Sequence, residues 1–159
     1  MLNESTINLD AIDVSLLDAL QRDAAPSNQA LAATLGVSPA TCLRRTRRLA
    51  DAGVIDRRVA VLNPDRLRAS LGAVVEITLD RQGAEHLAAF EARVAADASV
   101  RQCLRVAPGP DFVLMVQVRD MAGYGALVQR LFTQDANVRN VKAYVVVARA
   151  KFDTATLLP

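Results

Sequence analysis

The segment from Val37 to Arg58, VSPATCLRRTRRLADAGVIDRR, holds six arginines and only two acidic residues, in a chain whose net charge is +2. Guanidinium groups gathered in this way can bind a polyanion, through charge and through paired hydrogen bonds to phosphate or base oxygens. A basic run is also often just the solvated face of a helix. The elements around the segment therefore decide between these two interpretations.

The spacing of residues in this segment predicts an amphipathic helix. At about 100° per residue, Cys42, Thr46 and Leu49 fall on one side together with Ala50. This side is expected to pack on other helices. The opposite side carries Thr41, Arg44, Arg45 and Arg48, with Arg47 on one flank.

Two further helices are predicted ahead of the basic one. Residues 9–23 and 28–35 have apolar positions at helical spacing, and Gly36 can end the second helix in the left-handed conformation. Ser38 can then cap the basic helix, with Pro39 at its first position, where a missing N–H costs nothing. Two short helices separated by a glycine turn, the second with a basic face, are typical of a helix-turn-helix.

The residues after the basic helix extend this interpretation. Gly53 is expected to end the helix, and residues 54–63 form a β-rich run that carries Arg57 and Arg58. A strand at this place corresponds to the wing of a winged helix-turn-helix, which lies along a phosphate backbone. The module is therefore expected to bind double-stranded DNA.

DNA geometry suggests a role for each candidate side chain. Ser38 and the free amides at the helix start can hold a phosphate. Thr41 and Arg44 project furthest and are candidates for base edges, since Arg pairs with guanine and Thr touches the thymine methyl. The remaining arginines are expected to neutralise phosphates or flank the interface. They are Arg45, Arg47, Arg48, Arg57 and Arg58.

The hydrophobic pattern of the sequence changes from Gly72 onward. Apolar segments typical of strands and amphipathic segments typical of helices follow in the order β-α-β-β-α-β. This order predicts a ferredoxin-like antiparallel sheet covered on one face by two helices. The fold class is therefore α+β. The predicted domains are a winged helix-turn-helix over residues 1–63, a linker over 64–71, and the ferredoxin-like domain over 72–159. The predicted strands of that domain are 72–79, 100–107, 111–118 and 141–150, and its predicted helices are 84–97 and 121–134.

The apolar run from Phe112 to Val118 indicates a strand that is buried on both faces. Helices can cover only one of those faces in so small a domain. A partner subunit is expected to cover the other, so the chain is expected to form a homodimer or a higher homo-oligomer such as an octamer.

Composition argues against several other classes of protein. The 159 residues are 52% hydrophobic, yet they contain no apolar run near the roughly 20 residues that span a bilayer. The start lacks the layout of a signal peptide, which predicts a cytoplasmic protein. One histidine and two cysteines give no metal site, and no catalytic constellation or phosphate loop is present. We expect no cofactor, no metal and no enzymatic activity.

These motifs together resemble the Lrp/AsnC (feast/famine) family of transcription regulators, and most closely its leucine-responsive branch. The resemblance runs over roughly residues 9 to 152 and is carried by LDAIDVSLLDALQRDA, NQALAATLGVSPATCLRRTRRLADAGVI, PDFVLMVQVRDMAGY and YVVVARAK. It implies a sequence-specific regulator that assembles through its sheet domain. It also implies that an amino acid or related metabolite binds between dimers and acts as an effector.

The resemblance implies an effector site at the loop between the second and third strands. The family loop usually carries a T-G-x-x-D pattern, of which Asp111 matches and Gly109 lies one position late. Two prolines in this loop lack the N–H groups that could hold a ligand carboxylate, and Ala143 stands where the family often has Thr. The implied effector-binding residues are Ala107, Pro108, Gly109, Pro110 and Asp111.

Two alternatives remain open at this point. The same architecture resembles sirohaem decarboxylases, in which case His86, the single histidine, would be the residue available for tetrapyrrole chemistry. The chain could instead be a metabolite-sensing subunit without sequence-specific DNA binding, in which case the arginine face would have no role.

Overall fold

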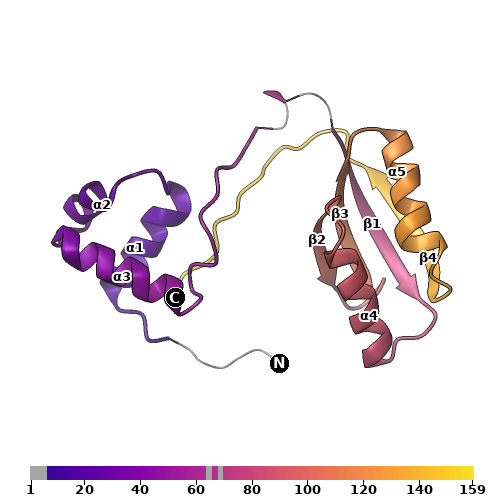
Figure 1. Cartoon of the computed structure of the whole chain (residues 1–159), viewed down its shortest axis with the longest axis horizontal. Coiled ribbons are helices and arrows are strands. Elements are labelled where there is room, and N and C mark those ends of the chain that lie inside the picture. The colour runs from indigo at the N-terminus through magenta and orange to yellow at the C-terminus, as the bar shows by residue number, and fades with distance from the viewer. Residues whose placement is uncertain (1–6, 64–65, 68–69) are drawn as a thin grey trace. The chain divides into compact units, whose positions relative to one another are not determined.

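The computed structural model describes residues 7–63, 66–67 and 70–159. The chain divides into a helical unit, Met1–Leu62 with Lys151–Pro159, and a sheet unit, Asn63–Ala150 (Figure 1). Within the described residues, no helix is long and apolar enough to cross a membrane.

Each helix of the helical unit begins at a polar residue that satisfies free backbone amides. Helix α1 (Ala11–Arg22) starts with a reciprocal capping box, in which Asp10 and Asp13 each accept a hydrogen bond from the other's backbone N–H. Ser27 caps α2 (Asn28–Leu35), and Ser38 caps α3 (Pro39–Asp51). The predicted helices are thus confirmed, with ends within a few residues of the expected positions.

The turn between α2 and α3 requires a glycine. Gly36 has φ +65°, in the left-handed region that residues with a Cβ rarely adopt. Its N–H donates to carbonyls at the end of α2, so the helix ends there and the chain can turn directly into the cap of α3.

A small apolar core holds the three helices together. Leu16, Leu49 and Cys42 have no exposed surface, and Ala32 is 1% exposed. Burying one such leucine stabilises the unit by about 2 kcal/mol. The buried residues of this core are Leu16, Leu17, Leu31, Ala32, Cys42 and Leu49.

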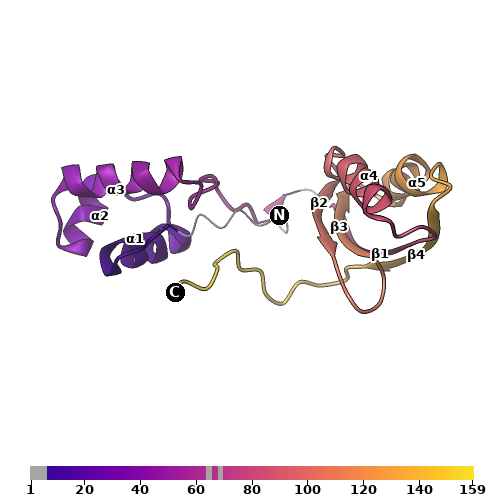
Figure 2. The same cartoon turned by 90° about the horizontal axis from the view of Figure 1, so that it is seen from below.

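The sheet unit has four antiparallel strands in the order β2-β3-β1-β4. Helices α4 and α5 lie on one face of this sheet and leave the other face open (Figure 2). The predicted ferredoxin-like order of elements is therefore confirmed. The bounds are β1 (Leu71–Leu79), α4 (Ala84–Ala95), β2 (Val100–Arg105), β3 (Phe112–Val118), α5 (Met121–Val128), a π-helical turn η2 (Gln129–Thr133) and β4 (Val138–Val145).

The core of the sheet unit lies between the sheet and its helices. Phe90 of α4 stacks on Phe112 of β3, with ring centroids 4.7 Å apart. Burial alternates along β1 and β3, so every second side chain points into this core. The apolar run in β3 is therefore half core and half open face: Val113 and Met115 lie on the face opposite α4 and α5.

Two expectations differ from the structure. Residues 54–63 form no strand, because among the described residues no neighbouring strand pairs with them. The predicted β-wing is therefore wrong for the single chain, and Val59 and Val61 are 65% and 61% exposed.

The C-terminal segment is the second difference. Residues 151–159 were assigned to the sheet domain, but they lie with the helical unit. Leu158 packs against the helical core, and the Thr156 N–H donates to Gln21 Oε1 at 3.0 Å. Of the predicted linker, residues 64–65 and 68–69 lie outside the described part of the chain.

Candidate nucleic-acid interface

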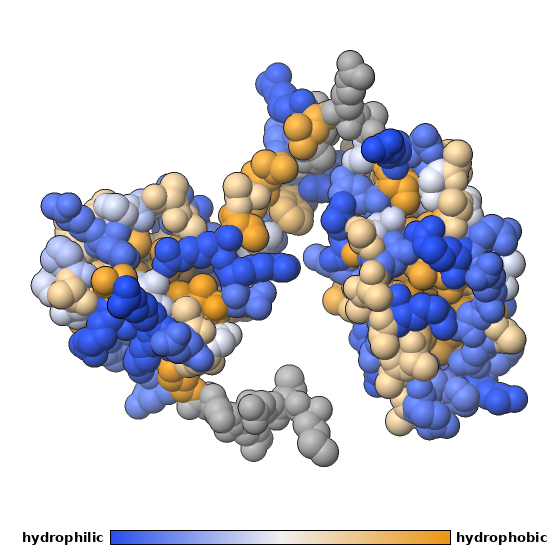
Figure 3. All heavy atoms as spheres, viewed as in Figure 1, coloured by the Kyte–Doolittle hydropathy of each residue, from blue (hydrophilic) through white to orange (hydrophobic). Residues whose placement is uncertain are grey.

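The exposed side of α3 carries the candidate DNA-binding surface. Arg44, Arg47 and Arg48 are exposed there, while the opposite side of the helix is buried in the helical core. Figure 3 shows hydrophilic side chains gathered over this part of the helical unit. Three arginines on one open face give a strongly positive surface. A shallow hollow on this face is lined by Ala40, Leu43, Arg44, Arg47, Arg48, Asp51 and Ala52.

The start of α3 is organised by two hydroxyl groups. Ser38 Oγ accepts a hydrogen bond from the Thr41 N–H at 3.1 Å and lies 2.9 Å from Thr41 Oγ1, to which it donates. The cap fixes the Thr41 side chain beside the helix entrance. The positive end of the helix dipole is at the same place, which favours an anion there.

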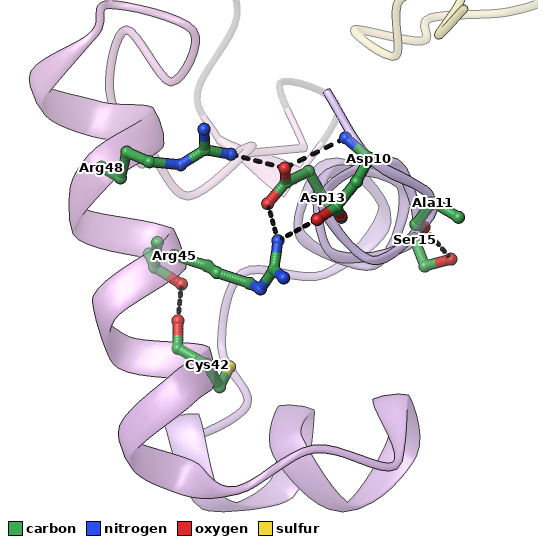
Figure 4. A network of polar contacts seen from close by, with 8 residues as sticks. Asp10, Ala11, Asp13, Ser15, Cys42, Arg45 and Arg48 are labelled. Atoms are coloured by element: carbon green, nitrogen blue, oxygen red, sulfur yellow. Dashed lines mark hydrogen bonds and ion pairs between the residues drawn. The ribbon is translucent and has the colours of Figure 1, made fainter. Parts of the chain in front are cut away.

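Arg45 lies differently from the other arginines of α3. Its side chain is only 18% exposed and points toward α1, where Nη1 donates to Asp10 Oδ2 at 2.7 Å and to Asp13 Oδ1 at 2.8 Å. Arg48 Nη2 donates to the other oxygen of Asp13 at 2.5 Å, with 42% of its side chain exposed. Figure 4 shows both guanidinium groups reaching from α3 to the same carboxylate of α1.

The Asp13 carboxylate is buried, with 1% of its side chain exposed. Burial alone would raise its pKa, but hydrogen bonds from Arg45, the Asp10 N–H and Arg48 outweigh this effect and hold the pKa below 3.8. The same contact with Asp13 raises the pKa of Arg45. The network is therefore fully ionised at neutral pH and joins α1 to α3.

The sequence interpretation missed Asp10 and Asp13, although a signal for Asp13 was present. Leu16, Leu17 and Leu20 follow Asp13 by three, four and seven residues, which places the aspartate on the core-facing stripe of α1. A buried acid requires a partner. Helix α3 supplies the two arginines that can meet this requirement.

Arg57 and Arg58 are exposed on the extended segment after α3. Arg57 Nε lies 3.5 Å from Asp56 Oδ2, and both side chains are highly exposed, so this contact contributes little stability. Both guanidinium groups are accessible to an anion. Among the described residues they are not held in a β-strand.

The predicted effector loop lies between β2 and β3. Asp111 is part of the frame of this loop: its Oδ2 accepts from the Leu79 N–H at 2.7 Å, and its own N–H donates to the Ile77 carbonyl at 2.8 Å. Ala107, Pro108 and Gly109 are exposed, while Pro110 and Asp111 are half-buried. Asp111 therefore anchors the loop to the end of β1.

The open face of the sheet is a second surface without cover. The register aligns Gln102, Met115, Val74 and Tyr144 in one row across the four strands. The neighbouring row contains Leu104, Val113, Glu76 and Lys142. Leu104 and Tyr144 are 50% and 52% exposed.

A helix-turn-helix with an open basic helix, joined to an antiparallel sheet domain, defines a class of protein: the DNA-binding transcriptional regulators with a ligand-binding domain. Comparison with known proteins identifies the family within this class. Residues 9–50 match the AsnC-type helix-turn-helix domain, and residues 72–156 match the Lrp/AsnC ligand binding domain. The chain belongs to the Lrp/AsnC family of transcriptional regulators, as its motifs predicted, and it is not an enzyme.

Individual relatives agree with this assignment. The leucine-responsive regulatory protein of Haemophilus influenzae is 38% identical over 143 residues, which cover 90% of this chain and 86% of that protein. The protein of the same name in Escherichia coli K12 is 36% identical over 144 residues, covering 91% and 88%.

Solved structures share the whole architecture. An AsnC family regulator from Agrobacterium tumefaciens has a TM-score of 0.84 and 29% identity, covering 94% of this chain and 97% of that one. A transcriptional regulator from Neisseria meningitidis, solved in complex with L-methionine, has a TM-score of 0.84 and 25% identity with the same coverage.

Proposed function

We propose that α3 is the recognition helix of a sequence-specific regulator and enters the major groove of double-stranded DNA. The observation that carries this proposal is the exposure of Arg44, Arg47 and Arg48 on a helix whose other side is fixed in the core. A helix fixed in this way holds its open side chains in one geometry, which reading base edges requires.

The surroundings of each side chain support a division of roles. Thr41 and Arg44 lie on the exposed side near the start of α3 and are proposed to contact base edges. Arg47 and Arg48 flank them and are proposed to contact phosphates, as are Arg57 and Arg58 on the extended segment. The capped start of α3 at Ser38 is proposed to accept a further phosphate. These contacts would take place in the cytoplasm, where the DNA is.

We further propose that the protein works as a homodimer or higher homo-oligomer. The open sheet face carries apolar side chains in its central strands, Val74, Val113 and Met115, with Leu104 and Tyr144 beside them. A second copy that covers this face would bury them. Two-fold pairing would present two recognition helices to half-sites of a pseudo-palindromic operator.

The effector is proposed to be an amino acid or a related metabolite that binds between sheet domains near Ala107–Asp111. The match to a ligand-binding domain and the L-methionine in the Neisseria relative support this choice. The Asp111 carboxylate already accepts the Leu79 N–H. The ligand would therefore depend on the remaining acceptor positions of Asp111 and on the partner subunit. Binding would shift the population of assemblies without any chemical step.

The test is selection of duplexes from a random pool by the purified full chain, followed by mobility-shift titration of the selected duplex. Selection of one recurring half-site motif, with binding that survives excess random duplex, is the expected result. Failure to enrich any motif would contradict sequence-specific recognition. The titration is then repeated with each of the common amino acids. A change in the number or position of shifted bands identifies the effector, and no change with any of them contradicts amino-acid sensing.

A further inference from the structure

The charge of α3 is not all available to DNA. Arg45 Nη1 is shared between Asp10 and Asp13, and its side chain is 18% exposed. Its Nε is buried and has no hydrogen-bond partner among the residues that the structure describes. Two carboxylates and one guanidinium in contact leave Arg45 with no positive charge to offer to a phosphate.

Arg48 is held only in part by the same carboxylate. Nη2 is bound to Asp13 Oδ2 at 2.5 Å, while 42% of the side chain remains exposed on the open face of α3. The guanidinium has five N–H donors in a rigid plane. Holding one amino group therefore fixes the direction in which the free donors point.

We propose that Asp13 is a positioning residue for DNA reading: through Arg45 it fixes how α3 lies on α1, and through Arg48 it fixes and limits the phosphate contact at the edge of the recognition helix. Arg45 makes no phosphate contact in this arrangement. The inference rests on the proposed function of α3 and adds to it a residue of α1 that never touches DNA.

Removal of the Asp13 charge is expected to change the selectivity for the selected duplex over random duplex more than the affinity for either. Without the Asp13 charge, Arg48 is free to bind any nearby phosphate, which strengthens binding that is independent of sequence, and Arg45 is held by Asp10 alone. At the same time, α3 loses two of the contacts that hold it against α1, those of Arg45 and Arg48 with Asp13, so Thr41 and Arg44 meet base edges less accurately. The ratio of affinities for selected and random duplexes should therefore fall.

The test compares the full chain with Asp13→Asn and a matched control, Asp18→Asn. Both substitutions remove one negative charge from α1, but Asp18 pairs with Arg22 of the same helix. The probes are the duplex selected by the wild-type chain and a random-sequence duplex of equal length. In Asp13→Asn the affinity ratio is expected to fall about tenfold, as for the loss of one specific base contact. In Asp18→Asn the ratio is expected to stay unchanged.

A merely structural role for Asp13 predicts a different result. Partial unfolding reduces the active fraction, which lowers both affinities by one factor and leaves their ratio unchanged. The proposal is overturned if the ratio falls less than about threefold, or if Asp18→Asn lowers it equally. The proposed function is tested separately by the duplex selection, which comes before this comparison, and it is contradicted if the wild-type chain selects no duplex.

A second variant keeps the inference testable even if Asp13→Asn does not fold. Arg45→Gln retains a polar side chain beside Asp10 and Asp13 and leaves the Asp13–Arg48 contact in place. Because Arg45 is proposed to contact no phosphate, the slope of log affinity against log salt should match that of the wild-type chain. A slope that becomes shallower by about 0.9, the amount for one phosphate contact, would show that Arg45 binds DNA and would overturn the assignment.

Discussion

Neighbouring arginines of α3 differ in what surrounds their guanidinium groups, and this difference decides what each can do. Arg44 and Arg47 are exposed. The Arg48 guanidinium binds one carboxylate and is partly exposed to solvent, and the Arg45 guanidinium binds both Asp10 and Asp13. The sequence pattern placed Arg45 on the same side as Arg44. The angle per residue alone could not reveal the difference, because the side chain bends toward an acid that lies 32 residues earlier.

The first prediction concerns the side chain of Arg44. Arg44→Ala should weaken binding to the selected duplex by about 1–3 kcal/mol, because a bidentate contact to a base edge is lost. Affinity for random duplex should fall much less. Mobility-shift titrations of both duplexes at one salt concentration measure the two effects. Arg22→Ala on α1 is the control, and an equal loss on both duplexes in Arg44→Ala would assign Arg44 to phosphate instead.

At the scale of elements, the ion-pair network adds to the apolar core in joining α1 to α3. The apolar core between the helices is small, and Asp13 is buried at the same contact. The capping box at the start of α1 gives Asp13 its second function, since the same carboxylate accepts the Asp10 N–H at 3.2 Å. Loss of this residue therefore affects the start of α1 and the contact between the helices together.

The second prediction concerns acid stability. The pKa of Asp13 lies below its ordinary value of 3.8, because hydrogen bonds from Arg45, Asp10 and Arg48 outweigh the effect of burial. The folded state therefore holds the Asp13 proton less tightly than the unfolded state does. The resulting stabilisation is complete above about pH 5 and is lost as the pH falls through the lowered pKa.

Asp13→Asn should thus lower the free energy of unfolding by on the order of 2 kcal/mol at neutral pH. The loss should shrink as the pH is lowered below about 4. Urea titrations at a series of pH values, followed on the helical unit by hydrogen exchange, measure both. A difference between the two proteins that stays constant down to low pH would contradict the role given to the Asp13 charge.

The third prediction concerns the C-terminal segment. Leu158 packs on the helical core, whereas its neighbour Leu157 is 99% exposed. Leu158→Ala should therefore destabilise the helical unit by about 1 kcal/mol, since the side chain is only half-buried. Leu157→Ala is the matched control and should have no effect. Amide hydrogen exchange in α1 distinguishes them, and equal exchange in both variants would contradict a structural role for the segment.

Much of this architecture could be predicted from sequence, and the exceptions share one cause. Helix caps, the glycine at position 36 and the apolar β-rich segments that became β1 and β3 are local signals, and they predicted the corresponding elements. The failed wing at residues 54–63 and the placement of residues 151–159 depend on partners distant in sequence. A β-rich run becomes a strand only where a neighbour pairs with it, and nothing local to Leu158 indicates which core it joins.

At the scale of the whole molecule, the sheet unit has one face covered by α4 and α5 and one face without cover. On the open face the central strands carry Val74, Val113 and Met115 with Glu76 among them, while the edge strands carry Gln102 and Lys142 beside Leu104 and Tyr144. An apolar centre with a mixed rim is the usual composition of a protein interface. The apolar run from Phe112 to Val116 in β3 follows if both faces of the strand are covered in the assembly.

The fourth prediction tests this assembly. Met115→Glu places a charge at the centre of the open face, where a second copy would bury it, and should therefore reduce the assembly to smaller species. Met121→Glu is the matched control, because Met121 is 58% exposed at the start of α5 and a carboxylate is favourable there. Light scattering after size-exclusion chromatography measures the mass of each. Equal masses for Met115→Glu and the wild-type chain would contradict assembly through this face.

The return of residues 151–159 to the helical unit has a topological consequence. The sheet unit is an insertion within a discontinuous DNA-binding unit, and the chain passes between the two units twice. A single protease cut between residues 63 and 70 therefore leaves the two units covalently joined through the C-terminal segment. A fragment that stops at residue 63 lacks Leu158 and the Thr156 contact to Gln21. We expect a recombinant helical unit that carries residues 151–159 behind the extended segment to be more stable than a fragment that stops at residue 63.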